Sequence, residues 1–395
     1  MESEKVLNKN FLCLCGANFL FFFSFYLILP ILPIHISNVV DSDKSIIGFI
    51  ISTYSLACLC IRPFSGYMMD AFYRKPLYIT TFSIFGLLFL GYPWANSIAL
   101  LILVRMIHGL GMGSTSVGGN TLIIDVSPAS KRGEAVGIFG IFSSIAMAIG
   151  PMTGIFLYNH IPFKTITFIC LGCCALGITF ASFVQTKFRP PIVRPPLSLD
   201  RFILKKGLFA GGSFMLIAFA YGQLVNYIAM YASEIHLNIS SGYFFTIYAI
   251  GLMMSRVYSG KMVDKGYLTQ VITVGTCVIV VALGLLAFCT YAPKDYLSTL
   301  FLLSAWICGI GYGITFPAYN NLFINLAPNN QRGTATSTYL TSWDLGIGIG
   351  IFVGGSIAER LSFSYSYAIA CMVVLLSMFY FIFVVTPHYH QNKLR

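Results

Sequence analysis

Long apolar segments alternate with short polar ones along nearly the whole chain. A helix needs about 20 apolar residues to cross a bilayer, and windows of that size are separated by hairpins of charged, Pro, Gly or Asn residues. The first run is too long for the core of a signal peptide and carries no small-residue cleavage site. The pattern predicts an all-α membrane protein with twelve transmembrane helices, approximately 10–34, 45–69, 76–93, 97–121, 134–158, 163–186, 207–231, 242–263, 268–291, 297–326, 333–357 and 361–385.

The composition excludes a soluble protein. Of the 395 residues, 57% are hydrophobic and only 9% are charged, whereas soluble domains are roughly 25% charged. The eleven Cys residues all lie in apolar stretches, so we expect buried thiols and no disulfide framework. Cys170, Cys173 and Cys174 have a spacing seen in metal sites, but they lack companion ligands, and we expect no metal.

The net charge of +11 is explained by topology and requires no nucleic-acid partner. With both termini inside the cell, only Lys44, Lys164, Lys294 and Arg360 fall in outer hairpins, as the positive-inside rule demands. The short loops suit a multi-pass protein of a bacterial inner membrane. The basic, Pro-rich segment 187–206 is expected to be a cytoplasmic linker, with a lipid-headgroup or regulatory contact as the alternative. It separates six-helix halves at 1–186 and 207–386, and 387–395 is predicted as a cytoplasmic tail.

The two halves share an internal repeat. Arg62, Gly66 and Asp70 recur 194 residues later as Arg256, Gly260 and Asp264. A second set recurs 200 residues later, from Gly109, Gly111, Gly113, Pro128, Arg132, Gly133, Gly150 and Gly154 to Gly309, Gly311, Gly313, Pro328, Arg332, Gly333, Gly350 and Gly354. Two six-helix repeats with a site between them at the midplane are the architecture of alternating-access secondary transporters.

Three of these stretches carry a family resemblance. Residues 66–75 (GYMMDAFYRK) resemble the inner-loop signature G-x-x-x-D-R/K-x-G-R-R/K of the major facilitator superfamily. Residues 105–111 (RMIHGLG) resemble its helix-4 signature, and 150–154 (GPMTG) is similar to the helix-5 motif of its drug/proton antiporters. Ala71 and Tyr73 depart from the first signature, whereas the second-half copy at 260–266 (GKMVDKG) keeps a basic residue and a Gly. The inner gate is therefore expected to depend more on the second copy.

A cytoplasmic gate is predicted where the duplicated motif reaches the inner face. Carboxylates set against helix N-termini and basic side chains form a latch that closes this face. The alternative is a group of ordinary solvated loop charges. The residues expected to form the gate are Arg62, Gly66, Asp70, Arg74, Lys75, Arg132, Arg256, Gly260, Asp264, Lys265 and Arg332.

Proton coupling is assigned to three residues within the membrane. Asp344 lies near the bilayer centre, where a carboxylate must be paired, hydrated or protonated, so it can load and unload a proton; the alternative is a structural acid. Arg105 stays charged and needs a partner, which could be Asp344, a carbonyl or an anionic substrate. The resemblance gives Arg105 a role in proton transfer, and the alternative is a structural pin between helices. His108 can titrate near neutrality, or pack through hydrogen bonds.

The substrate cavity is expected on helices 1, 4, 7 and 10, because the superfamily lines its cavity with them. The candidates on these helices, which individually could instead form interhelical bonds, are Asn18, Phe22, Tyr26, Ser114, Thr115, Tyr221, Gln223, Asn226 and Tyr227, and Trp343 on helix 11 is added to them. Together they predict a wide aromatic cavity with few fixed charges. A further set allows helices either to pack closely or to bend: Gly150, Pro151, Gly154, Gly346, Gly350 and Gly354.

These features predict a proton-coupled secondary transporter that exports small amphiphilic organic compounds by antiport. The chain has no G-x-x-x-x-G-K-[ST] motif for ATP and no set of catalytic groups, so we expect neither an enzyme nor a cofactor, and the proton gradient supplies the energy. The alternatives are uptake or export of a specific metabolite (a sugar, metal chelator, lipid or anionic solute) and a transport-inactive receptor or lipid-binding scaffold. The expected partners are a small molecule, protons and membrane lipids, with a monomer as the functional form.

Overall fold

The computed structural model describes residues 7–40, 43–128, 132–186, 203–328 and 332–394, and helices are the only regular elements in these ranges. Eleven helices are long and apolar enough to cross a membrane, and Gly242–Ser255 supplies a shorter apolar helix. The prediction of an all-α protein with twelve spans is confirmed. The α-helices are α1 (Lys9–Ile28), α2 (Leu32–Val40), α3 (Lys44–Ala71), α4 (Arg74–Leu87), α5 (Ile98–Val126), α6 (Arg132–Tyr158), α7 (Phe163–Phe183), α8 (Leu208–Glu234), α9 (Gly242–Asp264), α10 (Leu268–Phe288), α11 (Lys294–Leu326), α12 (Arg332–Arg360), α13 (Phe363–Tyr380) and α14 (Thr386–Asn392).

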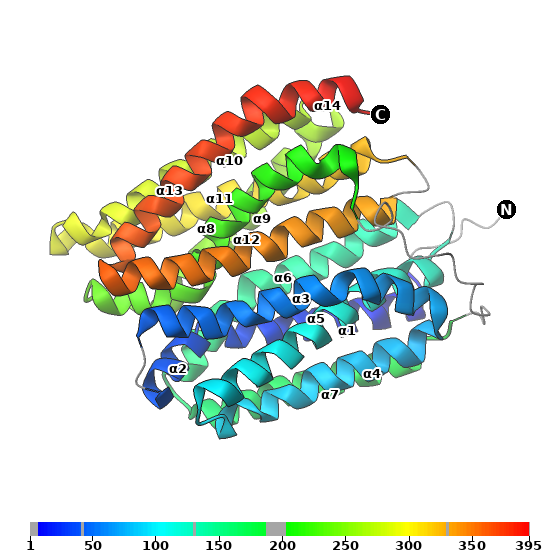
Figure 1. Ribbon diagram of the computed structural model, residues 1–395, viewed down its shortest axis with the longest axis horizontal. Coiled ribbons are helices and arrows are strands. Elements are labelled where there is room, and N and C mark those ends of the chain that lie inside the picture. Colours follow the sequence, from blue (N-terminus) through cyan, green and yellow to red (C-terminus); the bar gives the residue numbers. More distant parts are fainter. Residues whose placement is uncertain (1–6, 41–42, 129–131, 187–202, 329–331, 395) are drawn as a thin grey trace. The chain divides into compact units, whose positions relative to one another are not determined.

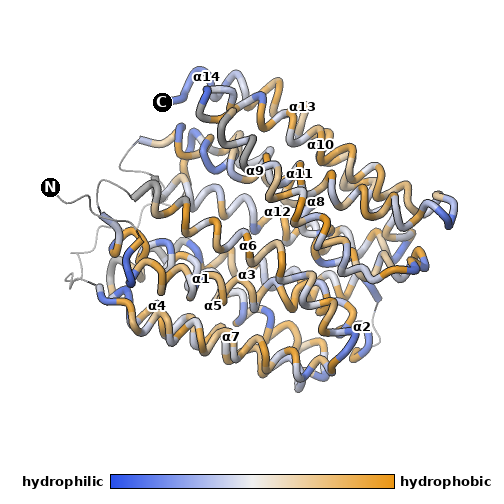
Figure 2. Tube along the Cα trace, turned by 180° about the vertical axis from the view of Figure 1, so that it is seen from behind, coloured by the Kyte–Doolittle hydropathy of each residue, from blue (hydrophilic) through white to orange (hydrophobic). Residues whose placement is uncertain are grey.

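Hydropathy and side-chain caps explain where these helices lie and where they begin. Apolar residues fill the middle of the helices, and hydrophilic residues gather toward their ends (Figure 2). Hydrocarbon offers no hydrogen-bond partners, so a helix in the membrane must pair its backbone N–H and C=O groups within itself. Asn8, Ser97 and Ser362 accept hydrogen bonds from the backbone N–H groups of Phe11, Leu100 and Tyr365. These caps provide partners for donors that have none within the helix.

The first predicted helix, 10–34, is interrupted. α1 ends at Ile28, and α2 begins at Leu32 after a turn. Pro30 lies in that turn, where it lacks an N–H donor and its ring would clash with the carbonyl four residues earlier. Pro33 is near the start of α2, a position that proline tolerates. The hydrophobic run therefore continues through two helices rather than one.

The first compact unit comprises Met1–His35 and Leu56–Pro196. Within it, α1 packs against α6 and α7, and α4 packs against α5 and α7. The blue-to-green helices α1, α4, α5, α6 and α7 of Figure 1 belong to this unit.

The second compact unit comprises Ile36–Ser55 and Leu197–Arg395. In this unit α8 packs against α12 and α13, and α10 packs against α11 and α13. These pairs correspond one for one to the pairs of the first unit, so the sequence repeat is reproduced as a repeat of helix packing. The remaining large contact of the second unit joins α9 to α11.

Helix α3 is shared between the units. Its residues up to Ser55 cluster with the second unit, and its residues from Leu56 onward cluster with the first. The boundary proposed from the sequence at 187–206 does not anticipate this, because it follows the order of the chain. One segment of the first half thus packs among the helices of the second.

The C-terminal segment predicted as a tail is largely helical and packed. α13 continues through a π-helical turn at Phe381–Val385 into α14. Tyr389 is buried, and its hydroxyl accepts a hydrogen bond from Nδ2 of Asn325 at 3.1 Å. The backbone N–H of Leu394 donates to the carbonyl oxygen of Asn325 at 3.0 Å. These contacts attach the end of the chain to α11.

Candidate functional site

In the first unit, α5 carries a buried group of polar residues. Arg105 is 1% exposed and His108 is fully buried. Nη1 of Arg105 donates to the hydroxyl of Tyr92 at 3.4 Å, and the same hydroxyl lies 2.8 Å from Nδ1 of His108. The rings of Phe85 and Phe89 pack on the imidazole, with centroids 4.3 and 4.8 Å away. Tyr92 joins the cation to the imidazole in one hydrogen-bonded chain.

The sequence analysis did not include Tyr92, because it falls at the end of a predicted span. Its ring belongs to the short 3-10 turn Tyr92–Trp94 that follows α4. Only the packing of that turn against α5 shows that the hydroxyl reaches both Arg105 and His108. No sequence motif would have identified it.

The candidate cavity residues of the first unit fall into two groups. Asn18 donates through Nδ2 to Oγ of Ser143 at 2.7 Å, which joins α1 to α6. Ser114 accepts from Oγ of Ser65 at 3.2 Å. Both therefore form interhelical bonds. Thr115 is also buried, but its Oγ1 has no hydrogen-bond partner among the described residues.

Phe22 and Tyr26 belong to a ladder of aromatic rings along α1. Their ring centroids are 6.2 Å apart and nearly parallel. Gly150 faces this helix, because a Cβ at that position would lie 2.7 Å from Cβ of Tyr26. A Cβ on Gly154 would overlap the carbonyl oxygen of Leu27. Gly150 and Gly154 flank Pro151 inside α6, so this stretch packs directly on the backbone of α1.

The second unit contains a cluster of aromatic side chains, which we call the aromatic cluster. It consists of Phe214 and Tyr221 on α8, Tyr312 and Phe316 on α11, and Trp343 on α12. The ring centroids of Trp343 lie 4.7 Å from Tyr221, 4.6 Å from Phe316 and 5.5 Å from Phe214. Tyr312 lies 5.3 Å from Tyr221. Three helices thus converge on one largely buried group of aromatic rings.

Asp344 follows Trp343 directly and is 8% exposed. It lies twelve residues after Arg332, which starts α12, or about 18 Å along the helix at 1.5 Å per residue. That is close to the middle of the hydrocarbon layer, about 30 Å thick. A buried carboxylate therefore lies at the midplane depth where the internal repeat predicts the site.

Three glycines hold α12 against α8 around this carboxylate. A Cβ on Gly346 would overlap the carbonyl oxygen of Met215, and one on Gly350 would overlap that of Phe219. A Cβ on Gly354 would lie 2.7 Å from Cγ of Gln223. The spacing of four residues places all three on one face of the helix. This geometry is that of close packing, and it fixes the position of Asp344 relative to α8.

Four polar candidates on α8 differ in what they contact. The Tyr227 hydroxyl donates to the carbonyl oxygen of Ile351 at 2.8 Å, and Oε1 of Gln223 accepts from Ser366 at 2.8 Å. Nδ2 of Asn226 donates within its own helix to the carbonyl of Gly222. Nε2 of Gln223 and Oδ1 of Asn226 are buried and lack a partner within the described residues. Tyr221 belongs to the aromatic cluster.

The predicted cytoplasmic gate is described only in part. Arg74 donates through Nη1 to both oxygens of Asp125, at 2.8 and 2.9 Å, and through Nε to the carbonyl of Met69. Nζ of Lys75 donates to the carbonyl of Ser182. Lys265 is exposed.

Asp125 was missed because the predicted helix ended at 121, whereas α5 continues to Val126. Arg62 is buried, and its Nη1 lies 3.5 Å from Oγ of Ser116. The other gate candidates have side chains outside the described part of the structure: Gly66, Asp70, Arg132, Arg256, Gly260, Asp264 and Arg332. The gate as a whole stays a prediction.

Two of the three clustered cysteines contact Ser24 of α1. Sγ of Cys174 lies 3.2 Å from Oγ of Ser24, and Sγ of Cys170 lies 3.5 Å from the Ser24 carbonyl oxygen. No group of three or more His, Cys, Asp or Glu side chains suited to a metal occurs in the part of the chain that was searched. The contacts with Ser24 are those of thiols packed between helices.

Comparison with known sequences decides the family. The sequence profile of the Major Facilitator Superfamily matches residues 14–351 and, in an overlapping match, 266–395. The chain belongs to the Major Facilitator Superfamily. This protein is accordingly a multi-pass membrane transporter of a small-molecule substrate and is not an enzyme. The resemblance drawn from the three signature stretches is confirmed.

Relatives within the superfamily are distant but cover most of the transporter. The staphylopine export protein of Staphylococcus aureus is 24% identical over 349 residues, which cover 82% of this chain and 83% of the relative. The multidrug resistance protein MdtG of Escherichia fergusonii is 22% identical over 381 residues, with 92% and 91% covered. An uncharacterized transporter of the superfamily from Methanocaldococcus jannaschii is 23% identical, with 91% and 93% covered.

Solved structures show the same fold. A D-xylose–proton symporter superposes with a TM-score of 0.79 at 15% identity, and covers 98% of this chain and 99% of its own. The nucleoside transporter NupG gives a TM-score of 0.74 at 16% identity, with 94% and 98% covered. At these identities the likeness concerns the fold of the transporter, which is the alternating-access fold predicted from the repeat.

Proposed function

We propose that this transporter exports small amphiphilic organic compounds in exchange for protons. The observation that carries the proposal is the position of Asp344, a buried carboxylate midway along α12 and adjacent to Trp343 of the aromatic cluster. The names of two relatives, a multidrug resistance protein and a staphylopine export protein, support export as the direction. The helix-5 motif at 150–154 supports it from the sequence.

The aromatic cluster suits a flat, apolar substrate. Aromatic faces stack with organic rings and attract cationic groups through their quadrupoles. Because these rings carry no fixed charge, they require few directional interactions from a substrate, and substrates of several shapes are accepted. Amphiphilic compounds with an aromatic or cationic portion fit this chemistry best.

The carboxylate provides the link between substrate and proton. At mid-membrane depth Asp344 must be paired, hydrated or protonated. If substrate and proton stabilise opposite states of this group, binding of one favours release of the other. By linkage, this coupling acts equally in both directions. An inward proton gradient then drives the substrate outward without ATP.

We also assign a role in proton transfer to the Arg105–Tyr92–His108 chain of the first unit. The hydrogen bond from Arg105 to the Tyr92 hydroxyl joins the guanidinium to the imidazole of His108. From the charge distribution we propose that the protein lies in a bacterial inner membrane with both termini in the cytoplasm. We further propose that the working form is a monomer in contact with lipid.

The test uses inside-out vesicles with an acidified interior and a pH-sensitive dye, against a panel of amphiphiles, sugars and metal chelators. A substrate is a compound that releases interior protons. For that compound we expect Asp344→Asn to lower the rate of release by at least about tenfold, since the amide cannot take up a proton. The matched control is Asp295→Asn, a change at an exposed position in the first turn of α11.

Full proton release by folded Asp344→Asn protein would reject Asp344 as the coupling group. Proton release with sugars or chelators, and none with amphiphiles, would reject the substrate class while keeping the coupling. Uptake of a labelled compound by intact cells, rather than its loss, would reject export.

Transport of a neutral polar metabolite is the second candidate. It is favoured by Nε2 of Gln223 and Oδ1 of Asn226, a donor and an acceptor that are buried and lack partners among the described side chains. The two residues lie three positions apart and so share a face of α8. The sugars in the panel test this candidate directly.

A further inference from the structure

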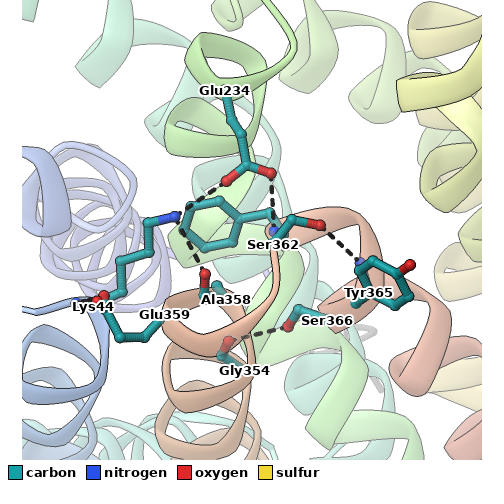
Figure 3. A network of polar contacts seen from close by, with 9 residues as sticks. Lys44, Glu234, Gly354, Ala358, Glu359, Ser362, Tyr365 and Ser366 are labelled. Carbon is teal, nitrogen blue, oxygen red and sulfur yellow. Dashed lines mark hydrogen bonds and ion pairs between the residues drawn. The ribbon is translucent and has the colours of Figure 1, made fainter.

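The second unit holds a group of charges far from the aromatic cluster, where α8 and α12 end and α3 begins. Lys44 is the first residue of α3, Glu234 the last of α8, and Glu359 the penultimate residue of α12. Nζ of Lys44 lies 3.1 Å from Oε2 of Glu234 and 3.2 Å from the carbonyl oxygen of Ala358 (Figure 3). The backbone N–H of Lys44 donates to Oε2 of Glu359 at 2.7 Å. We call these contacts the Lys44 clamp.

Each contact of the clamp satisfies a group that its own helix leaves open. The Lys44 N–H is a free donor at the start of α3, and the Ala358 carbonyl is one of the last four of α12. Carboxylates near helix N-termini and cations near C-termini are both favourable. Oε1 of Glu234 also accepts from the backbone N–H of Phe363 at 3.0 Å, and the Lys44 ammonium lies 4.8 Å from the centre of the Phe363 ring. Four helices therefore meet at one lysine.

Next to these charges, the first turns of α3 pack directly on α12. Oγ of Ser45 and Oγ of Ser356 are 3.0 Å apart. A Cβ on Gly48 would lie 2.9 Å from the carbonyl oxygen of Ile351, and one on Gly355 would lie 2.6 Å from that of Lys44. No side chain larger than hydrogen fits at either glycine unless the helices separate. The contact is close and combines these small and polar groups with one aromatic pair, Phe49 and Phe352, whose ring centroids are 6.1 Å apart.

The internal repeat shows that this clamp is present only once. The positions equivalent to Lys44 and Glu359, offset by 194 and 200 residues, hold Asn238 and Asn159. The segment equivalent to Ile36–Ser55 clusters with its own half of the chain, whereas Ile36–Ser55 clusters with the opposite half. The charges of the clamp and the clustering of a helix segment with the opposite half therefore occur together. Neither has a counterpart in the other copy of the repeat.

We propose that the Lys44 clamp is a reversible ionic lock that holds the first half of α3 on α8 and α12, and that it opens once in each transport cycle. From the charge distribution, the face it closes is the outer one. The clamp rests on the transporter function, and it depends on neither the substrate class nor the proton coupling. With side chains of Lys44 and Glu234 that are 33% and 26% exposed, water can reach the ion pair when the helices separate.

The test measures opening directly, without a substrate. Ser45→Cys provides a thiol in the contact between α3 and α12, and a membrane-impermeant maleimide reports how often that contact opens in intact cells. Protein without the added thiol gives the background from the native cysteines. We expect slow labelling of Ser45→Cys, and labelling about tenfold faster when Lys44→Gln or Glu234→Gln is added.

Two controls separate the lock from general damage. Lys294→Gln removes an exposed lysine that also begins a helix, α11, at this end of the unit, and we expect it to leave the labelling rate unchanged. The exchange Lys44→Glu with Glu234→Lys restores an opposite pair, and we expect it to slow labelling again. Labelling that is fast in the exchanged protein, or equal with and without Lys44→Gln, would overturn the lock.

A second measurement leaves Lys44 in place. Because the serine oxygens are 3.0 Å apart, Ser45→Cys with Ser356→Cys should form a disulfide on mild oxidation. Labelled substrate movement by the oxidised protein should stop and return on reduction, while each single variant keeps moving substrate after oxidation. Full transport by cross-linked protein would overturn the proposal, because the contact would then never need to open. The labelling result stands even where the proton-exchange proposal fails.

Discussion

Asp344 and His35 show how a single side chain takes its properties from the place that the fold gives it. Asp344 is notable in the sequence because it interrupts an apolar run, and its depth follows from its position in α12. His35 attracts no notice in the sequence. It lies in α2, between the spanning segments Lys9–Ile28 and Lys44–Arg62, where it stacks on Phe163 with ring centroids 3.6 Å apart. Its partner comes from a distant part of the first unit.

Burial lowers the pKa of His35 to about 4. In the unfolded chain the imidazole titrates near 6.5, so below that pH the unfolded state binds a proton that the folded state does not. We expect the contribution of His35 to the free energy of unfolding to be fully present above about pH 6.5 and to be lost as the pH drops toward 4. His35→Phe keeps a ring against Phe163 without a titrating group. Melting temperatures in detergent at pH 7 and pH 5 should fall more for the native protein than for His35→Phe; equal falls would contradict this expectation.

At the scale of elements, glycine positions determine how closely the helices approach. α6 meets α1 at Gly150 and Gly154, and α12 meets α8 at Gly346, Gly350 and Gly354. The same helix pair is thus formed by the same kind of residue in each unit, as the repeat requires. Small residues are the usual means of close packing in membranes, where apolar side chains gain little by leaving lipid.

Gly154→Ala should disrupt the contact between α1 and α6, because its Cβ would overlap the Leu27 carbonyl oxygen. Overpacking of this kind costs about 1–3 kcal/mol, and we expect a lower melting temperature in detergent. The matched control is Gly140→Ala in the same helix, where a Cβ meets nothing within 4 Å. Helix propensity alone makes that change neutral or stabilising, by up to about 1 kcal/mol. A melting temperature unchanged by Gly154→Ala would show that α1 and α6 can separate without loss.

At the scale of the whole molecule, two repeated packing units combine with one helix that belongs to both. The packing of α1 with α6 and α7 recurs as the packing of α8 with α12 and α13. α3 departs from the repeat because its first residues cluster with the second unit. The Lys44 clamp lies where α3 departs from the repeat, and this position supports its proposed opening during the transport cycle.

The orientation of the whole chain can be tested by fusions. Because basic residues concentrate on one side, we expect a fluorescent protein fused after Arg395 to fluoresce, as it does only in the cytoplasm. Alkaline phosphatase inserted in the hairpin between α10 and α11, near Lys294, should be active, as it is only outside. Phosphatase activity from a C-terminal fusion would reverse the topology and would place the Lys44 clamp at the inner face.

Much of the fold and part of the candidate site could be predicted from the sequence. Hydrophobic runs set the number of spans, and most predicted ends lie within a few residues of the observed helices. The errors occur where a helix continues into polar residues. α5 extends to Val126 and so includes Asp125, and α8 extends to Glu234. Both acids were assigned to loops, and each forms an ion pair in the structure.

The sequence by itself determined the helices, the repeat and the family, because each of these depends on local hydropathy or on a fixed spacing along the chain. The tertiary structure alone decided which partners the charged groups take. Tyr92 joins Arg105 to His108, Asp125 pairs with Arg74, and Lys44 meets Glu234. These contacts join residues on different helices or turns, and the choice among possible partners depends on how the helices pack. That packing is set by many weak contacts between surfaces, and no local pattern records it.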